Sequence, residues 1–192
     1  MISRDELAGI IDVMGAATID EVVSISMELS YMREEDESGE ERIKKLCQKA
    51  KDQHIIETVS SDEVKDITSN DTEYFIVGPN AFPDYPSELS EIIDILELSE
   101  RELDMDRVAR KFARRLKARL TFLKNRINEL PDPTPIDWIE ELEKKYSDLL
   151  NLYYDFDSWL PELFSPMEEE VIDVSKTLDN IKRQHKLFDT YI

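Results

Sequence analysis

Residues 107–130 read RVARKFARRLKARLTFLKNRINEL, and this stretch decides how the C-terminal half of the chain folds. Its apolar residues are alternately four and three positions apart: Ala109, Ala113, Leu116, Leu120, Leu123, Ile127 and Leu130. On an α-helix this spacing forms one continuous edge, where side chains of neighbouring helices interlock. The stretch therefore predicts a long helix whose apolar edge, here called a seam, packs against other helices.

Two further seams follow. The second comprises Ile139, Leu142, Tyr146, Leu149, Tyr153, Phe156 and Leu160. The third comprises Met167, Val171, Val174, Leu178, Ile181, His185, Phe188 and Ile192. Prolines cannot continue a helix, so the segments Pro131–Pro135 and Pro161–Pro166 should each reverse the chain. Because short connections favour antiparallel neighbours, residues 101–192 are predicted to form an antiparallel three-helix coiled-coil bundle. A longer dimeric coil and an open helical hairpin are the alternatives.

The N-terminal part carries three helix-start signals. Each is a capping box, in which a Ser or Thr and a Glu three positions later satisfy each other's backbone: Ser3 with Glu6, Thr18 with Glu21, and Ser38 with Glu41. The β-branched segments Ile55–Val59 and Thr72–Val77 then predict a hairpin. This order is typical of a winged helix-turn-helix domain. We expect a mainly α protein with that domain at residues 1–80, a proline-rich connector with a short helix at 81–100, and the bundle.

Two segments resemble a known family. They are Asp5-Glu6-Leu7-Ala8-Gly9 with Gly15-Ala16, and Val77-Gly78-Pro79-Asn80-Ala81-Phe82-Pro83. Both resemble an uncharacterised archaeal protein family with a winged-helix-like N-terminal domain, over about residues 3–130. The resemblance implies an archaeal origin and a cytoplasmic location. That family has no assigned activity, so the resemblance assigns no functional residues.

Charge is distributed unevenly along the chain. The 192 residues carry 44 acidic and 24 basic side chains, a net charge of −20. Residues 1–100 have a net charge of −17 and residues 131–192 one of −9, whereas residues 101–130 have one of +6. The basic segment contains nine cations and no acid between its first and last member: Arg107, Arg110, Lys111, Arg114, Arg115, Lys117, Arg119, Lys124 and Arg126. Since the seam occupies the inner face, we expect these cations on the outer faces, together with Phe112 and Phe122.

Three interpretations of this basic segment remain open. Glutamates of the neighbouring helices could neutralise it: Glu140, Glu141, Glu143, Glu168, Glu169 and Glu170. Alternatively it could bind an acidic protein, or the phosphates of nucleic acid. A weaker candidate surface lies on the third helix: Arg42, Lys44, Lys45, Lys49 and Lys51. Acidic residues share that helix and dominate the hairpin loop, which argues against DNA binding by the N-terminal domain alone.

No catalytic, cofactor-binding or metal site is predicted. His54 and His185 are far apart in sequence, and the single cysteine, Cys47, excludes the usual zinc spacings and an internal disulfide. Four glycines leave no phosphate-binding loop. Neither a signal peptide nor an apolar run of the roughly 18 residues that a membrane span needs is present. We therefore expect a cytoplasmic protein that is not an enzyme.

The sequence favours a non-enzymatic protein-interaction or adaptor module, built from the winged-helix-like domain and the helical bundle. Its bundle would join a protein partner or a second copy of the chain. The alternative is a DNA-associated transcriptional regulator that uses the basic helix 107–126 and the third helix 40–52.

Overall fold

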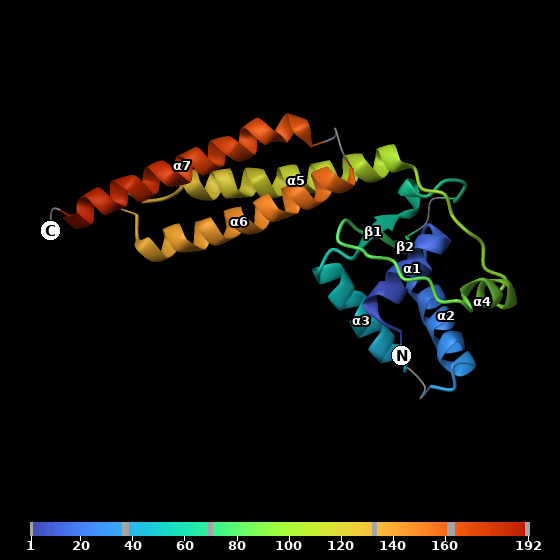
Figure 1. The fold of residues 1–192 in the computed structure, drawn as a ribbon. Coiled ribbons are helices and arrows are strands. Elements are labelled where there is room, and N and C mark those ends of the chain that lie inside the picture. The colour runs from blue at the N-terminus through green and yellow to red at the C-terminus, as the bar shows by residue number, and fades with distance from the viewer. Residues whose placement is uncertain (1, 36–38, 69–70, 132–133, 161–163, 191–192) are drawn as a thin grey trace. The chain divides into compact units, whose positions relative to one another are not determined.

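The computed structural model describes residues 2–35, 39–68, 71–131, 134–160 and 164–190, apart from the side chains of residues 165, 166 and 185–190 (Figure 1). The described chain is mainly helical, with one small antiparallel sheet of two strands. It divides into two compact units, Met1–Val108 and Ala109–Ile192. The boundary between them falls inside helix α5 (Met105–Asn128).

The first unit begins with three helices: α1 (Arg4–Met14), α2 (Ile19–Met32) and α3 (Glu40–Asp52). The capping boxes predicted at Ser3 and Thr18 are both present, so these side chains fix the starts of α1 and α2. The third predicted box begins at Ser38, which lies outside the described residues. The residue that caps α3 is Gly39, which has no side chain to donate or accept.

A hairpin follows these helices, as predicted. Strand β1 (Ile56–Ser60) pairs antiparallel with β2 (Glu73–Val77), with Thr58 opposite Phe75. Between them lies a short 3-10 helix, η1 (Ser61–Glu63). Both strands contribute to an apolar core that the helices close, with Leu7, Ile25 and Ile56 fully buried. Amphipathic helices and half-buried strands of this kind are held together mainly by burial of apolar area.

Residues 81–108 belong to the first unit, including the segment that the sequence suggested as a connector. Helix α4 (Leu89–Ile95) buries Leu89 and Ile92 in the same core. Further along, Arg101 forms two hydrogen bonds of 2.6 and 2.8 Å to the Glu21 carboxylate, and donates to the Ala16 carbonyl. Its guanidinium also lies over the Tyr74 ring, 5.2 Å from the centroid. A single side chain therefore ties the segment before α5 to the start of α2 and to the sheet.

The Glu21 carboxylate is adapted to this partner. Burial alone would raise its pKa, but the hydrogen bonds from Arg101 and from the Thr18 backbone outweigh burial and hold the pKa below its usual value. Gly15 allows the segment to approach, since its φ of +67° is readily adopted by glycine and the Arg101 carbonyl packs directly against its Cα.

The second unit consists of three long helices: the greater part of α5, then α6 (Ile136–Trp159) and α7 (Ser165–Thr190) (Figure 1). Phe112 near the start of α5 stacks on Phe156 near the end of α6, with ring centroids 5.0 Å apart. Arg126 near the end of α5 lies over Trp138 at the start of α6. These contacts make α5 and α6 antiparallel. The Tyr146 hydroxyl donates to the Val171 carbonyl across α6 and α7.

The three predicted seams lie on the inner faces of these helices. Buried seam residues are Ala109, Leu116, Leu120, Leu123, Ile127, Ile139, Leu142, Leu149, Tyr153, Phe156, Leu160, Met167, Val171, Val174 and Leu178. Ala113, Leu130, Tyr146 and Ile181 are half-buried. The seam side chains from His185 onward lie outside the described residues. None of the helices in the described part of the chain combines the length and the apolarity of a membrane span.

Replacing Gly15 should strongly destabilise the first unit. A Cβ at this position would stand 2.0 Å from the Arg101 carbonyl oxygen, at a φ that L-residues rarely adopt. We expect Gly15→Ala to lower the free energy of unfolding by about 2–5 kcal/mol in urea titrations followed by circular dichroism. Gly39→Ala is the matched control, because a Cβ there meets open space; it should cost less than about 1 kcal/mol. Equal effects of the two variants would contradict this account.

The Arg101–Glu21 pair should make stability depend on pH. Because the pKa of Glu21 is lowered in the folded state, its contribution is present above the carboxyl's usual pKa and is lost as the pH falls through the folded-state value. Arg101→Gln should therefore cost about 1–3 kcal/mol at pH 7 and less at pH 3. Urea unfolding of both proteins at pH 7, 5 and 3 measures the difference. A cost that is constant over this range would show that Arg101 acts without its charge.

Candidate interaction surfaces of helix α5

Helix α5 presents all nine predicted basic residues away from the core. Arg107, Arg110, Arg114, Arg115, Lys117, Arg119 and Arg126 are exposed, and Lys111 and Lys124 are half-buried. The cause is local. An α-helix has 3.6 residues per turn, so when its apolar face is buried the remaining positions point outward. Arg107 belongs to the first unit and the other eight to the second.

Six of these cations have interaction partners. Lys124 donates to Glu170 of α7 at 2.7 Å, and Arg126 lies 3.9 Å from the Glu129 carboxylate. Arg107 pairs with Asp104 and donates to the Asp62 carbonyl. Lys111, Arg115 and Arg119 also have partners. These contacts neutralise part of the basic segment.

The other three form no ion pair with any residue that the structure describes: Arg110, Arg114 and Lys117. The Nε group of Arg114 donates to the Arg110 carbonyl, which leaves the rest of its guanidinium fork unoccupied. At spacings of four and three residues, the three side chains lie on one edge of α5. We call Arg110, Arg114 and Lys117 the basic edge.

Of the six glutamates expected to neutralise α5, one pairs with it and two pair with cations of α6 or α7. Glu170 reaches Lys124, and that hydrogen bond and charge, with a smaller effect of Lys117, lower the pKa of Glu170. Glu141 instead pairs with Lys145 of its own helix at 2.6 Å, and Glu143 pairs with Lys182 of α7. Internal neutralisation is therefore partial, since α6 and α7 carry cations of their own.

The cations of α3 also divide into those that form ion pairs and those that do not. Lys44 pairs with Glu40 at 2.5 Å, and Lys51 lies 3.6 Å from Glu73 and over the Phe75 ring. Arg42, Lys45 and Lys49 are exposed and lack ion pairs among the described residues. The loop between β1 and β2 packs against the segment before α5, because Val64 bridges to Leu103 and Lys65 pairs with Glu102.

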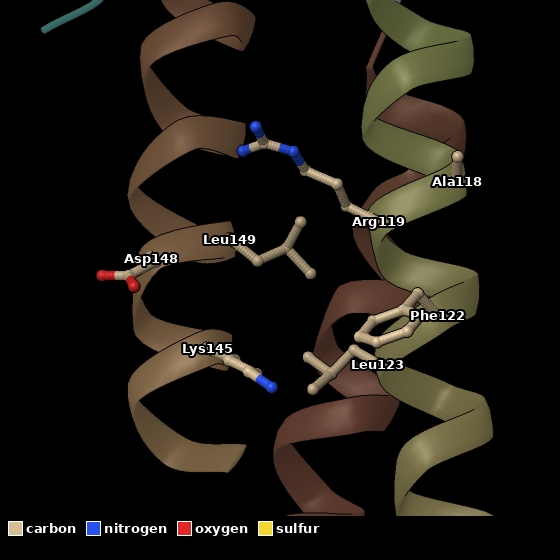
Figure 2. Close-up of a pocket in the computed structure, with 7 residues that line it drawn as sticks. All are labelled: Ala118, Arg119, Phe122, Leu123, Lys145, Asp148 and Leu149. Carbon is tan, nitrogen blue, oxygen red and sulfur yellow. The ribbon is translucent and has the colours of Figure 1, made fainter. Parts of the chain in front are cut away.

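A groove that the sequence did not predict lies between α5 and α6. It encloses a volume of about 460 Å³ and is lined by Ala118, Arg119, Phe122, Leu123, Lys145, Asp148 and Leu149. Figure 2 shows Phe122 and Leu123 of α5 pointing toward Lys145 and Leu149 of α6, whereas Asp148 points away. Phe122 is 58% exposed, with the Lys145 ammonium 5.9 Å from its ring centroid. We call this the α5/α6 groove.

A second hollow between the same two helices is lined by Arg126, Leu130, Trp138, Glu141 and Leu142. Trp138 is 43% exposed and marks this end of the surface. The signal that could have revealed the groove is the position of Phe122 and Trp138, which are large apolar residues outside the seams. The sequence places Phe122 on the outer face of its helix, but nothing in the sequence shows that α6 lies beside it.

Phe112 corrects a prediction, because it does not lie on the outer face with Phe122. It is 2% exposed, and its ring contacts both Phe156 and Trp159, with the Trp159 centroid 5.5 Å away. The buried face of α5 is wider than the two positions per heptad that define a seam, as expected for a helix that packs against two others.

The residue types that could serve in catalysis or metal binding do not cluster in the described part of the chain. Within the described residues, no three His, Cys, Asp or Glu side chains form a group that could hold a metal ion. Cys47 is buried, and burial raises the pKa of its thiol to about 11, so the reactive thiolate is rare at neutral pH. The Nδ1 atom of His54 lies 2.5 Å from the Glu57 carboxylate. The side chain of His185 lies outside the described part.

These features describe a mainly helical protein with a small antiparallel sheet and two compact units. The chain belongs to DUF7109, a family of unknown function, which matches residues 5–177. The match extends past residue 130, where the resemblance in sequence was expected to end, and so includes α5, α6 and half of α7. No curated protein matches the chain, and no solved structure does.

The two phenylalanines of α5 should respond differently to truncation. Phe112→Ala removes a buried ring and its aromatic contacts, so it should lower the free energy of unfolding by about 3–5 kcal/mol. Phe122→Ala should change it by less than about 1 kcal/mol, because the ring is largely exposed. Thermal and urea unfolding of both variants provide the comparison. A large loss for Phe122→Ala would instead make that ring part of the core.

Proposed function

We propose that the protein is a non-enzymatic interaction module that binds a helix of a partner protein in the α5/α6 groove. In this proposal the first unit is a winged-helix-like domain, and α5, α6 and α7 form an antiparallel three-helix coiled-coil bundle. The partner contributes a fourth helix to that bundle.

The exposure of Phe122 above an apolar floor carries this proposal. Leu123 and Leu149 form the floor, and the aromatic ring stands beside them with more than half of its surface in water. Large exposed aromatic residues next to apolar hollows are the usual energetic centres of protein interfaces. Burying such a ring on binding contributes about 1.5–3 kcal/mol.

The shape of the groove favours a helix as the occupant. Its two walls are helices, and the hollow at Trp138 continues along the same pair of helices. An amphipathic helix lies in such a groove with apolar residues at positions i, i+4 and i+7. The charged residues that line the two hollows are Arg119, Lys145 and Arg126, against Asp148 and Glu141. Cations are in slight excess, so the partner helix should carry more acidic than basic residues beside its apolar stripe.

The winged-helix assignment is supported by the element order of the first unit, with α1, α2 and α3 followed by the β1–β2 hairpin. The coiled-coil assignment is supported by the three buried seams. We also propose the cytoplasmic location and archaeal origin that the family resemblance implies.

Photo-crosslinking from the groove tests this function. A photoreactive residue at position 122, and another at position 138, should crosslink in cells to one protein, within one predicted amphipathic helix. The same residue at position 154 is the control, since Tyr154 is 60% exposed but lines neither hollow. Crosslinks from positions 122 and 154 to the same set of proteins would contradict the proposal, and crosslinks between two copies of the chain would replace it with self-association.

A peptide with the sequence of the crosslinked helix should then bind the full chain in a calorimetric titration. Phe122→Ser should weaken this binding by about 10- to 100-fold, the effect of losing a central interface aromatic. Tyr154→Ser, which removes an equally exposed ring elsewhere on α6, should leave the affinity unchanged. A peptide that binds both variants equally would place the interface outside the groove.

A further inference from the structure

The basic edge lies on a different face of α5 from Arg119 and Leu123, which line the α5/α6 groove. Successive helix positions turn by about 100°, so Arg110, Arg114 and Lys117 lie roughly 120–180° around the helix from Arg119. The two surfaces meet at Ala118, but Arg110, Arg114 and Lys117 line neither hollow between α5 and α6. The chemistry of the basic edge needs a separate explanation.

We propose that the basic edge binds the phosphate backbone of duplex nucleic acid, without reading its sequence. This goes beyond the proposed function, because it assigns a second ligand to a second surface of the bundle. Two of the three side chains are arginines, whose planar guanidinium groups bind phosphate oxygens through two parallel hydrogen bonds.

The structure leaves these three cations without the partners that the others have. Lys124 pairs with Glu170 of α7. Arg126 pairs with Glu129 and Arg107 with Asp104, each three residues away in the sequence. Lys124 donates the hydrogen bond to Glu170. The charge of Lys117 lowers the pKa of Glu170 only slightly and forms no hydrogen bond with it. The cations of the basic edge are therefore available to an external anion.

The neighbours of the basic edge favour phosphate over a protein partner. Going on from Arg114 in steps of four, three and four residues, the next positions along α5 are Ala118, Thr121 and Asn125. All three are exposed and small or polar, and Ala118 also forms the border with the α5/α6 groove. A protein interface needs a buried apolar or aromatic centre, and this side of α5 offers none among these positions. Contacts to nucleic-acid backbones need cations and small polar groups instead.

The net charge of −20 does not cancel this attraction at physiological salt. Charges in solution are largely screened beyond about 8–10 Å, so acidic residues farther away contribute little to the field at the basic edge. Backbone contacts release counterions, and the logarithm of affinity falls with the logarithm of salt by about 0.9 per phosphate contacted. Three contacts predict a slope near −2.7, which is about a 40-fold loss of affinity between 50 and 200 mM salt.

Fluorescence anisotropy with the full chain and a labelled 20-base-pair duplex measures this slope. The variant Arg110→Gln/Arg114→Gln/Lys117→Gln should lose binding at 50 mM salt, while duplexes of unrelated sequence bind the wild type alike. Glutamine keeps the helix propensity, and circular dichroism checks the fold. The control Lys144→Gln/Lys176→Gln/Arg183→Gln removes the same three charges from exposed positions of α6 and α7, and should bind as the wild type does.

The conservative variant Arg110→Lys/Arg114→Lys separates charge from folding, and it should retain most of the binding. The proposal is wrong if the wild type does not bind the duplex at 50 mM salt, or if the glutamine variant binds as tightly as the wild type. It is also wrong if poly-glutamate binds the basic edge and the duplex does not, because the surface would then recognise an acidic protein. The groove experiments change residues outside the basic edge, so either result leaves the other proposal intact.

Discussion

The second unit depends on one constraint, that α5 must bury a continuous apolar seam against α6 and α7. Leu116, Leu120 and Leu123 satisfy this constraint and are almost completely removed from water. Because the buried seam fixes the rotation of α5 about its axis, the nine cations must lie on its outer surface. The same rotation sets Phe122 beside α6 and leaves Arg114 exposed to solvent. Both candidate surfaces are consequences of how the core is packed.

The sequence predicted most elements because their signals are local. Capping boxes at Ser3 and Thr18, β-branched strand segments, and seams interrupted by prolines each depend on a few neighbouring residues. The placement of Phe112 was predicted wrongly, since the width of a buried face depends on how many helices surround it. The pairing of Arg101 with Glu21 could not be predicted either, because that contact joins positions 80 residues apart.

The sequence predicted which basic residues α5 carries, but not which of them form ion pairs with neighbouring acids. Counting charges located the basic helix, but the choice among its three interpretations depends on which acid meets which cation. Glu141 pairs with Lys145 of its own helix and Glu143 with Lys182 of α7, both at the surface of the unit. Which of these pairs forms depends on how the helices are arranged around one another. The α5/α6 groove was missed for a related reason, since a hollow is formed by residues on two helices whose register the sequence does not state.

The attachment of Arg101 to Glu21 also affects how this gene can evolve. The first unit is complete only with residues that follow the proline-containing segment, because the Arg101 amide donates to the Met14 carbonyl and its side chain neutralises an acid of α2. A gene break at codon 100 would separate that acid from its counter-ion. A recombination event that exchanges the second unit would therefore have to join the two genes within the codons for α5. The joined helix would also have to keep the spacing of its apolar residues across the junction.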